Sequence, residues 1–155
     1  MKLEIMGVGK LRDKHYKALM DDYMKRLGRY LPSAETCLRE SKLTARDRPA
    51  GLAEEAEAFR KKCGPNTIKV IMDERGKTWT SVEMARQIEG WMTRGERHVA
   101  FFIGSATGLD ASLRDEADVT LALSTMTLPH EMARVFLAEQ LYRSMTIIRG
   151  EPYHK

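Results

Sequence analysis

Hydrophobic and polar positions follow two different periods along the chain, one typical of strands and one typical of helices. Short apolar or β-branched runs, several of them bounded by glycine or charge, predict strands. HVAFFIG at 98–104 is apolar throughout, which favours a strand buried on both faces of a sheet. The predicted strands are KLEIMGVG (2–9, ending in a turn), AETCLRE (34–40), TIKVIMD (67–73), HVAFFIG (98–104) and VTLAL (119–123).

Most of the segments between the predicted strands have apolar residues at helical spacing. TSVE at 80–83 matches a capping box, with Thr80 as N-cap and Glu83 reaching back to it. Asp110 begins a short helix, and Pro129 suits the first turn of a long closing one. We therefore predict helices over 16–31, 52–63, 80–91, 110–117 and 129–148, and non-helical connections at 41–51 (SKLTARDRPAG) and 73–79 (DERGKTW).

Strands alternate with helices from end to end, which indicates an α/β fold: a mainly parallel sheet flanked by helices. The 155 residues contain no internal repeat and no linker, so we expect a single domain over 1–155. The closing helix is apolar on more than one side. It therefore needs two partners, one of which can be the sheet and the other a second subunit.

Composition narrows the class of protein. Hydrophobic residues make up 43% and charged residues 31% of the chain, as in a globular protein rather than a disordered one. The apolar runs are too short to cross a membrane, and the N-terminus lacks the features of a signal peptide, so we expect a cytoplasmic protein. Cys37 and Cys63 lack the spacing of a zinc or dithiol site and are expected to be buried free thiols.

The positive charge is unevenly distributed. Residues 1–62 contain 15 Lys and Arg against 10 Asp and Glu, whereas residues 63–155 contain 11 against 12. A basic face of this kind attracts nucleic-acid phosphates, but ordinary solvated helices have the same composition. Charge alone leaves both interpretations open.

Three strand ends lead into unusual loops and could line one pocket, because ligands of open α/β sheets lie beyond the carboxyl ends of strands. These are Met72 with Asp73, Gly104–Gly108 and Leu123–Leu128. Gly7-Val8-Gly9 is only a fragment of a nucleotide motif, so a phosphate cradle is not expected. The hydroxyl-rich third loop suits a flat uncharged ring such as adenine. Alternatively, its Ser and Thr cap the next helix, and the glycines serve only a turn.

Two histidines need separate interpretations. His130 follows Pro129 and is expected to be a structural residue of the helix's first turn. RGEPYHK, at 149–155, is by default a disordered tail, yet its aromatic, imidazole and basic groups can stack on a base, exchange protons and hold phosphates.

Four segments together resemble the RlmH-type methyltransferases of the SPOUT superfamily over the whole chain. They are KLEIMGVGK, DERGKTW, FFIGSATGL and LPHEMARVFLAEQLYRSMTIIRGEPYHK. The resemblance implies a homodimer with a C-terminal trefoil knot. It also implies S-adenosylmethionine as cofactor and methyl transfer to N3 of a pseudouridine in 23S (large-subunit) ribosomal RNA on the assembled ribosome. Carried onto this chain, the implied cofactor residues are Met72, Gly104, Leu123, Ser124, Thr125, Met126, Thr127 and Leu128.

The chain departs from the family pattern at Ser105, where a second glycine is usual, and mildly at Met72, where leucine is common. A side chain at position 105 is expected to crowd the cofactor or to demand a different backbone angle. A catalytically silent ribosome-binding protein is therefore one alternative. An α/β enzyme acting on small molecules is another.

Methyl transfer from a sulfonium needs alignment rather than a metal, and the sequence contains no metal-ligand cluster. The proton on N3 must leave. His154 is the candidate base, Tyr153 a stacking or orienting group and Arg143 a stabiliser; the alternative is that the tail only positions RNA and water takes the proton. Ribosome affinity is expected to depend on basic residues such as Lys10, Arg12, Arg46 and Arg48.

Overall fold

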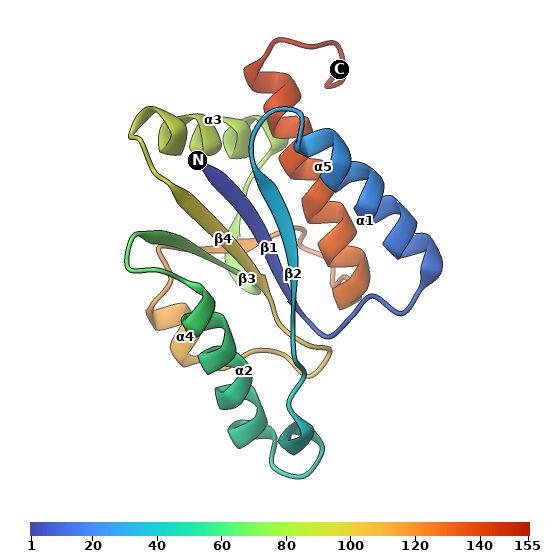
Figure 1. Ribbon diagram of the computed structural model, residues 1–155, viewed down its shortest axis with the longest axis vertical. Helices are drawn as coiled ribbons and strands as arrows, with labels where there is room; N and C mark the ends of the chain where they lie inside the picture. Colours follow the sequence, from blue (N-terminus) through green and yellow to red (C-terminus); the bar gives the residue numbers. More distant parts are fainter.

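The computed structural model describes residues 1–155 and has five parallel strands between helices, which confirms the expected α/β class (Figure 1). The strands are β1 (Lys2–Val8), β2 (Ser33–Leu38), β3 (Thr67–Thr78), β4 (His98–Ile103) and β5 (Val119–Ala122). The helices are α1 (Lys14–Leu27), α2 (Arg48–Lys62), α3 (Ser81–Thr93), α4 (Ser112–Asp115) and α5 (His130–Ile148), with a 3-10 turn η1 (Lys42–Ala45).

The strand order is β2-β1-β4-β3-β5, and every neighbouring pair is parallel. Parallel neighbours need crossover connections, and each crossover between paired strands here carries a helix. Because all five strands run the same way, their carboxyl ends meet at one edge of the sheet. That edge receives all the loops whose chemistry the sequence singled out.

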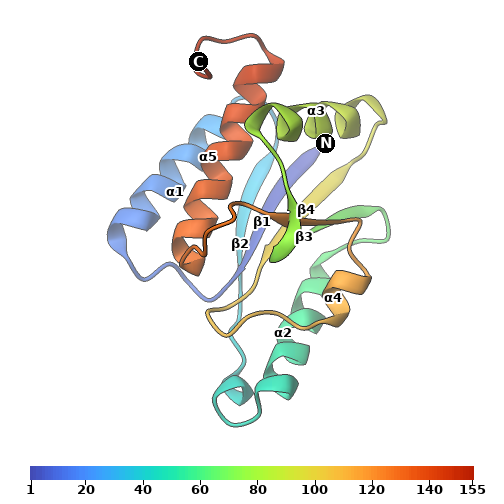
Figure 2. The ribbon, with the colours of Figure 1, turned by 180° about the vertical axis from the view of Figure 1, so that it is seen from behind.

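Two apolar cores lie on opposite faces of the sheet. Successive residues of β4 alternate between them: Val99, Phe101 and Ile103 face the core that includes α1, α3 and α5, whereas Ala100 and Phe102 face α2 and α4. All five are buried, as the unbroken apolar run predicts. Figures 1 and 2 show α1 beside α5, and α2 and α4 away from them across the sheet.

Local signals explain where the helices begin. The capping box is confirmed, because Thr80 and Glu83 each bond the other's backbone at the start of α3. Two aspartates, Asp13 and Asp47, accept N–H bonds in the first turns of α1 and α2. The cap at Asp47 corrects one prediction: residues 41–51 are not a loop throughout, because Pro49 fits the first turn of α2.

A second correction concerns residues 73–79. They were predicted as a turn, but β3 continues to Thr78, with a register shift against β5 between Met72 and Lys77. β5 pairs with β3 on both sides of this irregularity. A Cβ at Gly76 would lie 2.6 Å from the backbone nitrogen of Leu121, so glycine is what allows the two strands to cross so closely.

Helix α5 packs between α1 and α3 as well as against the sheet. Most of its apolar surface is thus covered within one chain, and a second subunit is not required to explain its wide apolar pattern. Two large side chains of α5 remain exposed, Met132 at 37% and Phe136 at 39%. They lie one turn apart on the same side of the helix.

Both cysteines are free, but only Cys63 is partly covered. Burial raises the pKa of its thiol to about 11, which keeps it neutral. Cys37 is exposed, contrary to prediction, because it lies on β2, an edge strand with no further strand beside it. Separately, none of the helices has the length and apolarity needed to cross a membrane.

A charged cluster joins four strands, β1, β2, β3 and β4. Glu4 is 6% exposed and accepts hydrogen bonds from Lys2 Nζ at 2.7 Å and Thr36 Oγ1 at 2.5 Å. His98 Nε2 lies 2.9 Å from the same carboxylate, and His98 Nδ1 lies 3.0 Å from Thr67 Oγ1. Burial opposes ionisation of Glu4, but these partners outweigh it, and its pKa lies below the ordinary value.

We predict that Glu4→Gln lowers stability at neutral pH by about 1–3 kcal/mol, since charge-assisted bonds at a buried site are lost. A carboxyl group whose pKa is lowered by folding stabilises the protein above its unfolded pKa, and this contribution is lost as the pH falls through the folded pKa. Urea unfolding between about pH 3 and pH 7 should therefore show a smaller acid-induced loss of stability in the variant. Exposed Glu89→Gln is the control; equal pH dependence in Glu4→Gln and unsubstituted protein would contradict the prediction.

Candidate functional site

A cavity of about 910 Å³ lies at the carboxyl edge of the sheet. All three predicted strand ends line it, as Met72 with Asp73, Gly104–Gly108, and most of Leu123–Leu128. Their convergence follows from topology, because β4 pairs with β3 and β3 pairs with β5. The single pocket predicted from sequence is thus present.

The loop after β4 is folded tightly on itself. A Cβ at Gly104 would lie 2.4 Å from the carbonyl oxygen of Gly108, and Gly108 has φ +104°. Both positions therefore require glycine. Gly108 N donates to the carbonyl of Ser105 at 3.0 Å, which closes the turn.

Ser105 does not need the unusual backbone angle that its place in a glycine loop suggested. No residue other than glycine has a positive φ, and Ser105 is buried. Its Oγ lies 2.7 Å from Thr107 Oγ1, so the hydroxyl is paired within the loop. The serine thus fits the loop without backbone strain.

The hydroxyl group of Ser124 is hydrogen-bonded within the loop from Leu123 to Leu128. Ser124 Oγ accepts a hydrogen bond from Met126 N at 2.9 Å, and α5 begins at His130, after Pro129, without a side-chain cap. The alternative that these hydroxyls cap the helix is therefore wrong. Thr125 is the one predicted cofactor residue that does not line the cavity, and Met126 lines it while remaining 76% exposed.

Charged side chains form another part of the cavity wall. Asp73, only 8% exposed at its side chain, accepts a bond from Arg114 Nη1 at 2.9 Å. Arg48 donates to the carbonyl oxygen of Thr107 and so attaches the start of α2 to the glycine loop. Arg75 also lines the cavity.

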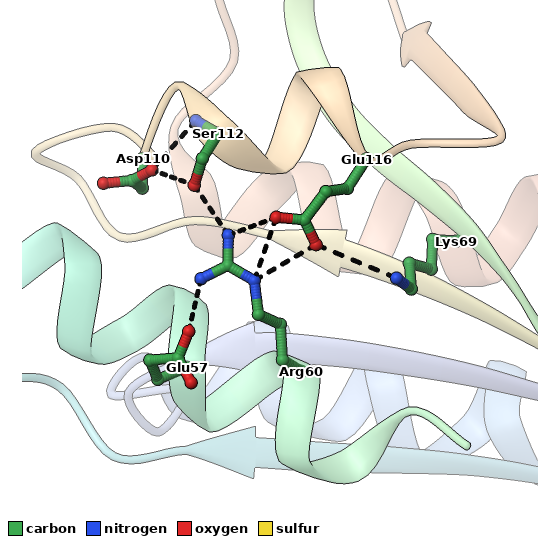
Figure 3. Close-up of polar contacts among 6 residues, drawn as sticks. All are labelled: Glu57, Arg60, Lys69, Asp110, Ser112 and Glu116. Carbon is green, nitrogen blue, oxygen red and sulfur yellow. Dashed lines mark hydrogen bonds and ion pairs between the residues drawn. The ribbon is translucent and has the colours of Figure 1, made fainter. Parts of the chain in front are cut away.

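A second arginine of α2 holds the segment that follows the glycine loop (Figure 3). Arg60 Nη2 donates to Glu116 Oε1 and to Ser112 Oγ, each at 2.6 Å, and Arg60 Nη1 pairs with Glu57 at 2.6 Å. Asp110 in turn accepts from the backbone N–H and hydroxyl of Ser112. This network joins α2 to α4 and fixes the exit of the loop.

The first two turns of α5 have two different faces. His130 and Ala133 line the cavity, so His130 lies at the site as well as in the first turn. Arg134 is fully buried on the other face and donates to Gly9 O at 2.9 Å and to Glu35. A Cβ at Gly7 would lie 2.6 Å from Arg134 Nε, so this glycine makes room for an arginine rather than for a phosphate.

The C-terminal tail is ordered, which contradicts its default interpretation as a frayed end. Tyr153 OH donates to Glu139 Oε1 at 3.0 Å, and Arg143 bonds the same carboxylate. Burial and hydrogen bonds raise the pKa of Tyr153, which therefore stays a neutral phenol. His154 is exposed, with Nδ1 3.4 Å from Arg143 Nη1. The three predicted catalytic residues thus lie together.

They do not lie at the cavity of their own chain. Helix α5 begins at the cavity and carries the tail at its other end, and its 19 residues span about 28 Å. Figures 1 and 2 both show the C-terminus beyond the far end of α5. Within one chain, the predicted cofactor residues and the predicted catalytic residues therefore lie at opposite ends of α5.

Sequence reasoning missed several residues that support the site: Arg60, Arg114, Glu131 and Arg134. Only Arg134 had a signal, because a charged residue inside the apolar stretch MARVFLA is unusual. The other three lie on polar segments, and nothing in their spacing distinguishes them from solvated charges.

A parallel α/β sheet with a cavity beyond its strand ends defines the class of ligand-binding α/β enzymes. The chain belongs more narrowly to the SPOUT methyltransferase family, whose model, described as "Predicted SPOUT methyltransferase", matches residues 1–154. Membership makes the protein an enzyme of the methyltransferase class.

Similar proteins cover the same length. The chain is 46% identical over 159 residues to "Ribosomal RNA large subunit methyltransferase H" of Anaeromyxobacter sp. (strain Fw109-5), with all of both chains covered. It is 39% identical over 159 residues to the protein of that name from Acetivibrio thermocellus, again with both chains covered completely. A third protein of that name, from Chromobacterium violaceum, is 43% identical over 159 residues, which cover 100% of this chain and 99% of that one.

We predict that Arg60→Gln destabilises the protein by about 1–2 kcal/mol, because one guanidinium serves two carboxylates and a hydroxyl. Differential scanning calorimetry should show a melting temperature lower by about 3–8 °C. Lys17→Gln is the control, since the one salt bridge of Lys17 is with exposed Asp21 on its own helix. Equal effects of the two substitutions would contradict a special role for the Arg60 network.

Proposed function

We propose that the protein transfers a methyl group from S-adenosylmethionine to N3 of a pseudouridine in 23S ribosomal RNA, on the assembled ribosome. The observation that carries the proposal is the cavity formed by the three strand ends in a chain of the SPOUT methyltransferase family. The relatives' printed name, with its large-subunit ribosomal RNA, supports the substrate. We further propose that residues 1–155 act as one domain in the cytoplasm.

The cavity suits this cofactor. Its volume of about 910 Å³ lies within the range of about 300–1,000 Å³ typical of small-molecule sites. Backbone groups near Gly104, at Ser124 and at Met126–Leu128 would hold the adenosine, with Met72 and Leu123 giving apolar contact. When bound, the cofactor supplies an electrophilic methyl group on a sulfonium. The chain then has to orient the target nitrogen and exclude water.

The basic residues named from sequence support RNA docking at the same edge of the sheet. Lys10 and Arg12 follow the carboxyl end of β1, Arg46 follows η1 after β2, and Arg48 lines the cavity. All four are exposed. Phosphates held by them would bring a nucleotide to the mouth of the cavity, with salt-sensitive affinity.

The proton of the target nitrogen needs an acceptor. His154 is exposed and carries an imidazole beside Arg143, whose charge favours an anion forming nearby. Tyr153, neutral and packed on Tyr142 at 4.8 Å between ring centroids, orients this group rather than acting as the base. In the proposed reaction N3 gives its proton to His154 and bonds the methyl carbon, whose bond to sulfur breaks and leaves S-adenosylhomocysteine.

The length of α5 favours a homodimer, because a tail about 28 Å from its own cavity can act only at another one. The exposed Met132 and Phe136 near the cavity end of α5 supply an apolar face for the second copy. We propose that each tail completes the partner's cavity and that the Leu123–Leu128 loop belongs to a trefoil knot. The strain-free backbone at Ser105 supports an active enzyme over a catalytically silent protein.

The test of this function is transfer of labelled methyl from S-adenosylmethionine to ribosomes that lack the modification. We expect label on N3 of a pseudouridine, identified by mass spectrometry. Gly104→Ala should lower cofactor affinity by more than about tenfold, because its Cβ forces the backbone at Gly108 to shift. Gly64→Ala, at an exposed turn where a Cβ would meet no atom closer than 3.8 Å, is the control for loss of a glycine. Absence of label with folded, dimeric protein would contradict the proposal.

A mixed-dimer experiment tests the shared site. Gly104→Ala and His154→Ala are each expected to be nearly inactive alone. In each heterodimer one of the two sites joins an intact cavity to the partner's intact tail. Equal amounts co-refolded at random give about half heterodimers, so the mixture should regain up to about a quarter of the unsubstituted activity. No recovery in verified heterodimers would mean that the tail does not act in the partner. Unchanged activity of His154→Ala alone would remove it from the reaction.

A further inference from the structure

The first two turns of α5 contact the loop between β1 and α1, residues 9–13, on the face turned away from the cavity. Arg134 Nη1 donates to Gly9 O at 2.9 Å, at the start of this loop. At its end, Glu131 accepts two backbone bonds, from Arg12 N at 3.0 Å and from Asp13 N at 3.2 Å. Both ends of the loop are therefore fixed by one helix.

Glu131 is well suited to this role. Each of its carboxylate oxygens accepts a hydrogen bond from one backbone N–H group, Oε1 from Arg12 and Oε2 from Asp13. Hydrogen bonding by the backbone of Arg12, against some desolvation, lowers the pKa of Glu131, so the carboxylate is charged at neutral pH. Glu131 makes no salt bridge with Arg12, whose guanidinium lies 3.9 Å from Glu40 instead.

The position of this acid is otherwise unfavourable. The loop it holds carries Lys10 and Arg12, two exposed cations at the edge proposed to meet RNA. A carboxylate beside an RNA-binding surface repels phosphates, so long-range charge alone would favour its absence. Its contacts are with backbone N–H groups and not with the cations, which indicates a structural contribution to the surface.

We propose that Glu131 is a positioning residue for RNA binding: by holding the backbone of Arg12 and Asp13 it presents Lys10 and Arg12 to the phosphates. The inference rests on the proposed function. Electrostatics alone predicts that removing this negative charge strengthens RNA binding, whereas the inference predicts that removing it weakens RNA binding. A mobile loop has to be ordered when RNA binds, and that entropy cost lowers affinity.

Three substitutions distinguish the effect of side-chain length at position 131 from the effect of negative charge. Glu131→Asp keeps the charge and the acid in the first helical turn but is one methylene too short to reach both N–H groups. Glu131→Gln keeps the length but loses the charge and replaces one acceptor oxygen by a donor. Glu40→Gln removes an acid from the same edge without touching the backbone of the loop, and is the control.

The experiment measures the affinity of each protein for purified ribosomes over a range of salt concentrations. Glu131→Asp and Glu131→Gln are expected to bind about five- to tenfold more weakly, with a shallower salt dependence, and Glu40→Gln as tightly or more tightly. Hydrogen exchange of the Arg12 and Asp13 amides, measured without RNA, should be faster in both Glu131 variants. Affinity for S-adenosylhomocysteine should stay unchanged, which checks that the cavity remains folded.

Each outcome has one meaning. If Glu131→Gln binds ribosomes as tightly as the unsubstituted protein, or more tightly, charge dominates and the inference is overturned. It is also overturned if binding weakens while the two amides exchange at the original rate. If the unsubstituted protein binds no ribosomes, the proposed function fails first, and the inference falls with it.

Discussion

The close crossing of β5 over β3 is the constraint on which the site depends. β5 pairs with β3 both before and after its irregularity, and the backbones meet at Gly76, where a Cβ would lie 2.6 Å from Leu121 N. This crossing carries the chain after Ala122 toward the ends of β3 and β4. The loop that follows therefore faces Gly104 across the cavity.

Helix α5 connects the parts that have to act together. One face of its first turns lines the cavity through His130 and Ala133, and another holds the β1–α1 loop through Glu131 and Arg134. The buried Arg134 is costly to desolvate, and Glu35 and Gly9 O offset that cost. A rigid helix gives these contacts a fixed spacing, which a loop would not.

The same rigidity separates the cavity from the tail. Because α5 is a single helix, the groups at its two ends cannot approach each other within a chain. The glycine loop, meanwhile, is held by Arg48 of α2. Arg60 of the same helix holds the segment that follows the loop (Figure 3). The protein thus has a preorganised cavity and, at the other end of α5, an ordered tail that lies away from it.

Much was decided by the sequence itself. Periodicity, the Thr80–Glu83 box and the apolar run of β4 predicted the elements and the α/β class, because these signals act between near neighbours. Parallel topology then implied that the three loop-bearing strand ends would converge. The extension of β3 beyond Asp73 and the start of α2 at Arg48 were missed, because pairing with β5 and the Asp47 cap outweighed local turn composition.

Only the tertiary structure decided the rest. Three features depend on side-chain directions: Thr125 does not line the cavity, Ser105 pairs with Thr107, and Glu131 accepts a hydrogen bond from the backbone of Arg12. Gly7 and Arg134 lie far apart in the sequence, yet the absence of a side chain at Gly7 leaves the space that the Arg134 side chain fills. Local patterns specify which residues form an element, whereas contacts between distant segments exist only after the chain has packed, and it is these contacts that position the chemistry.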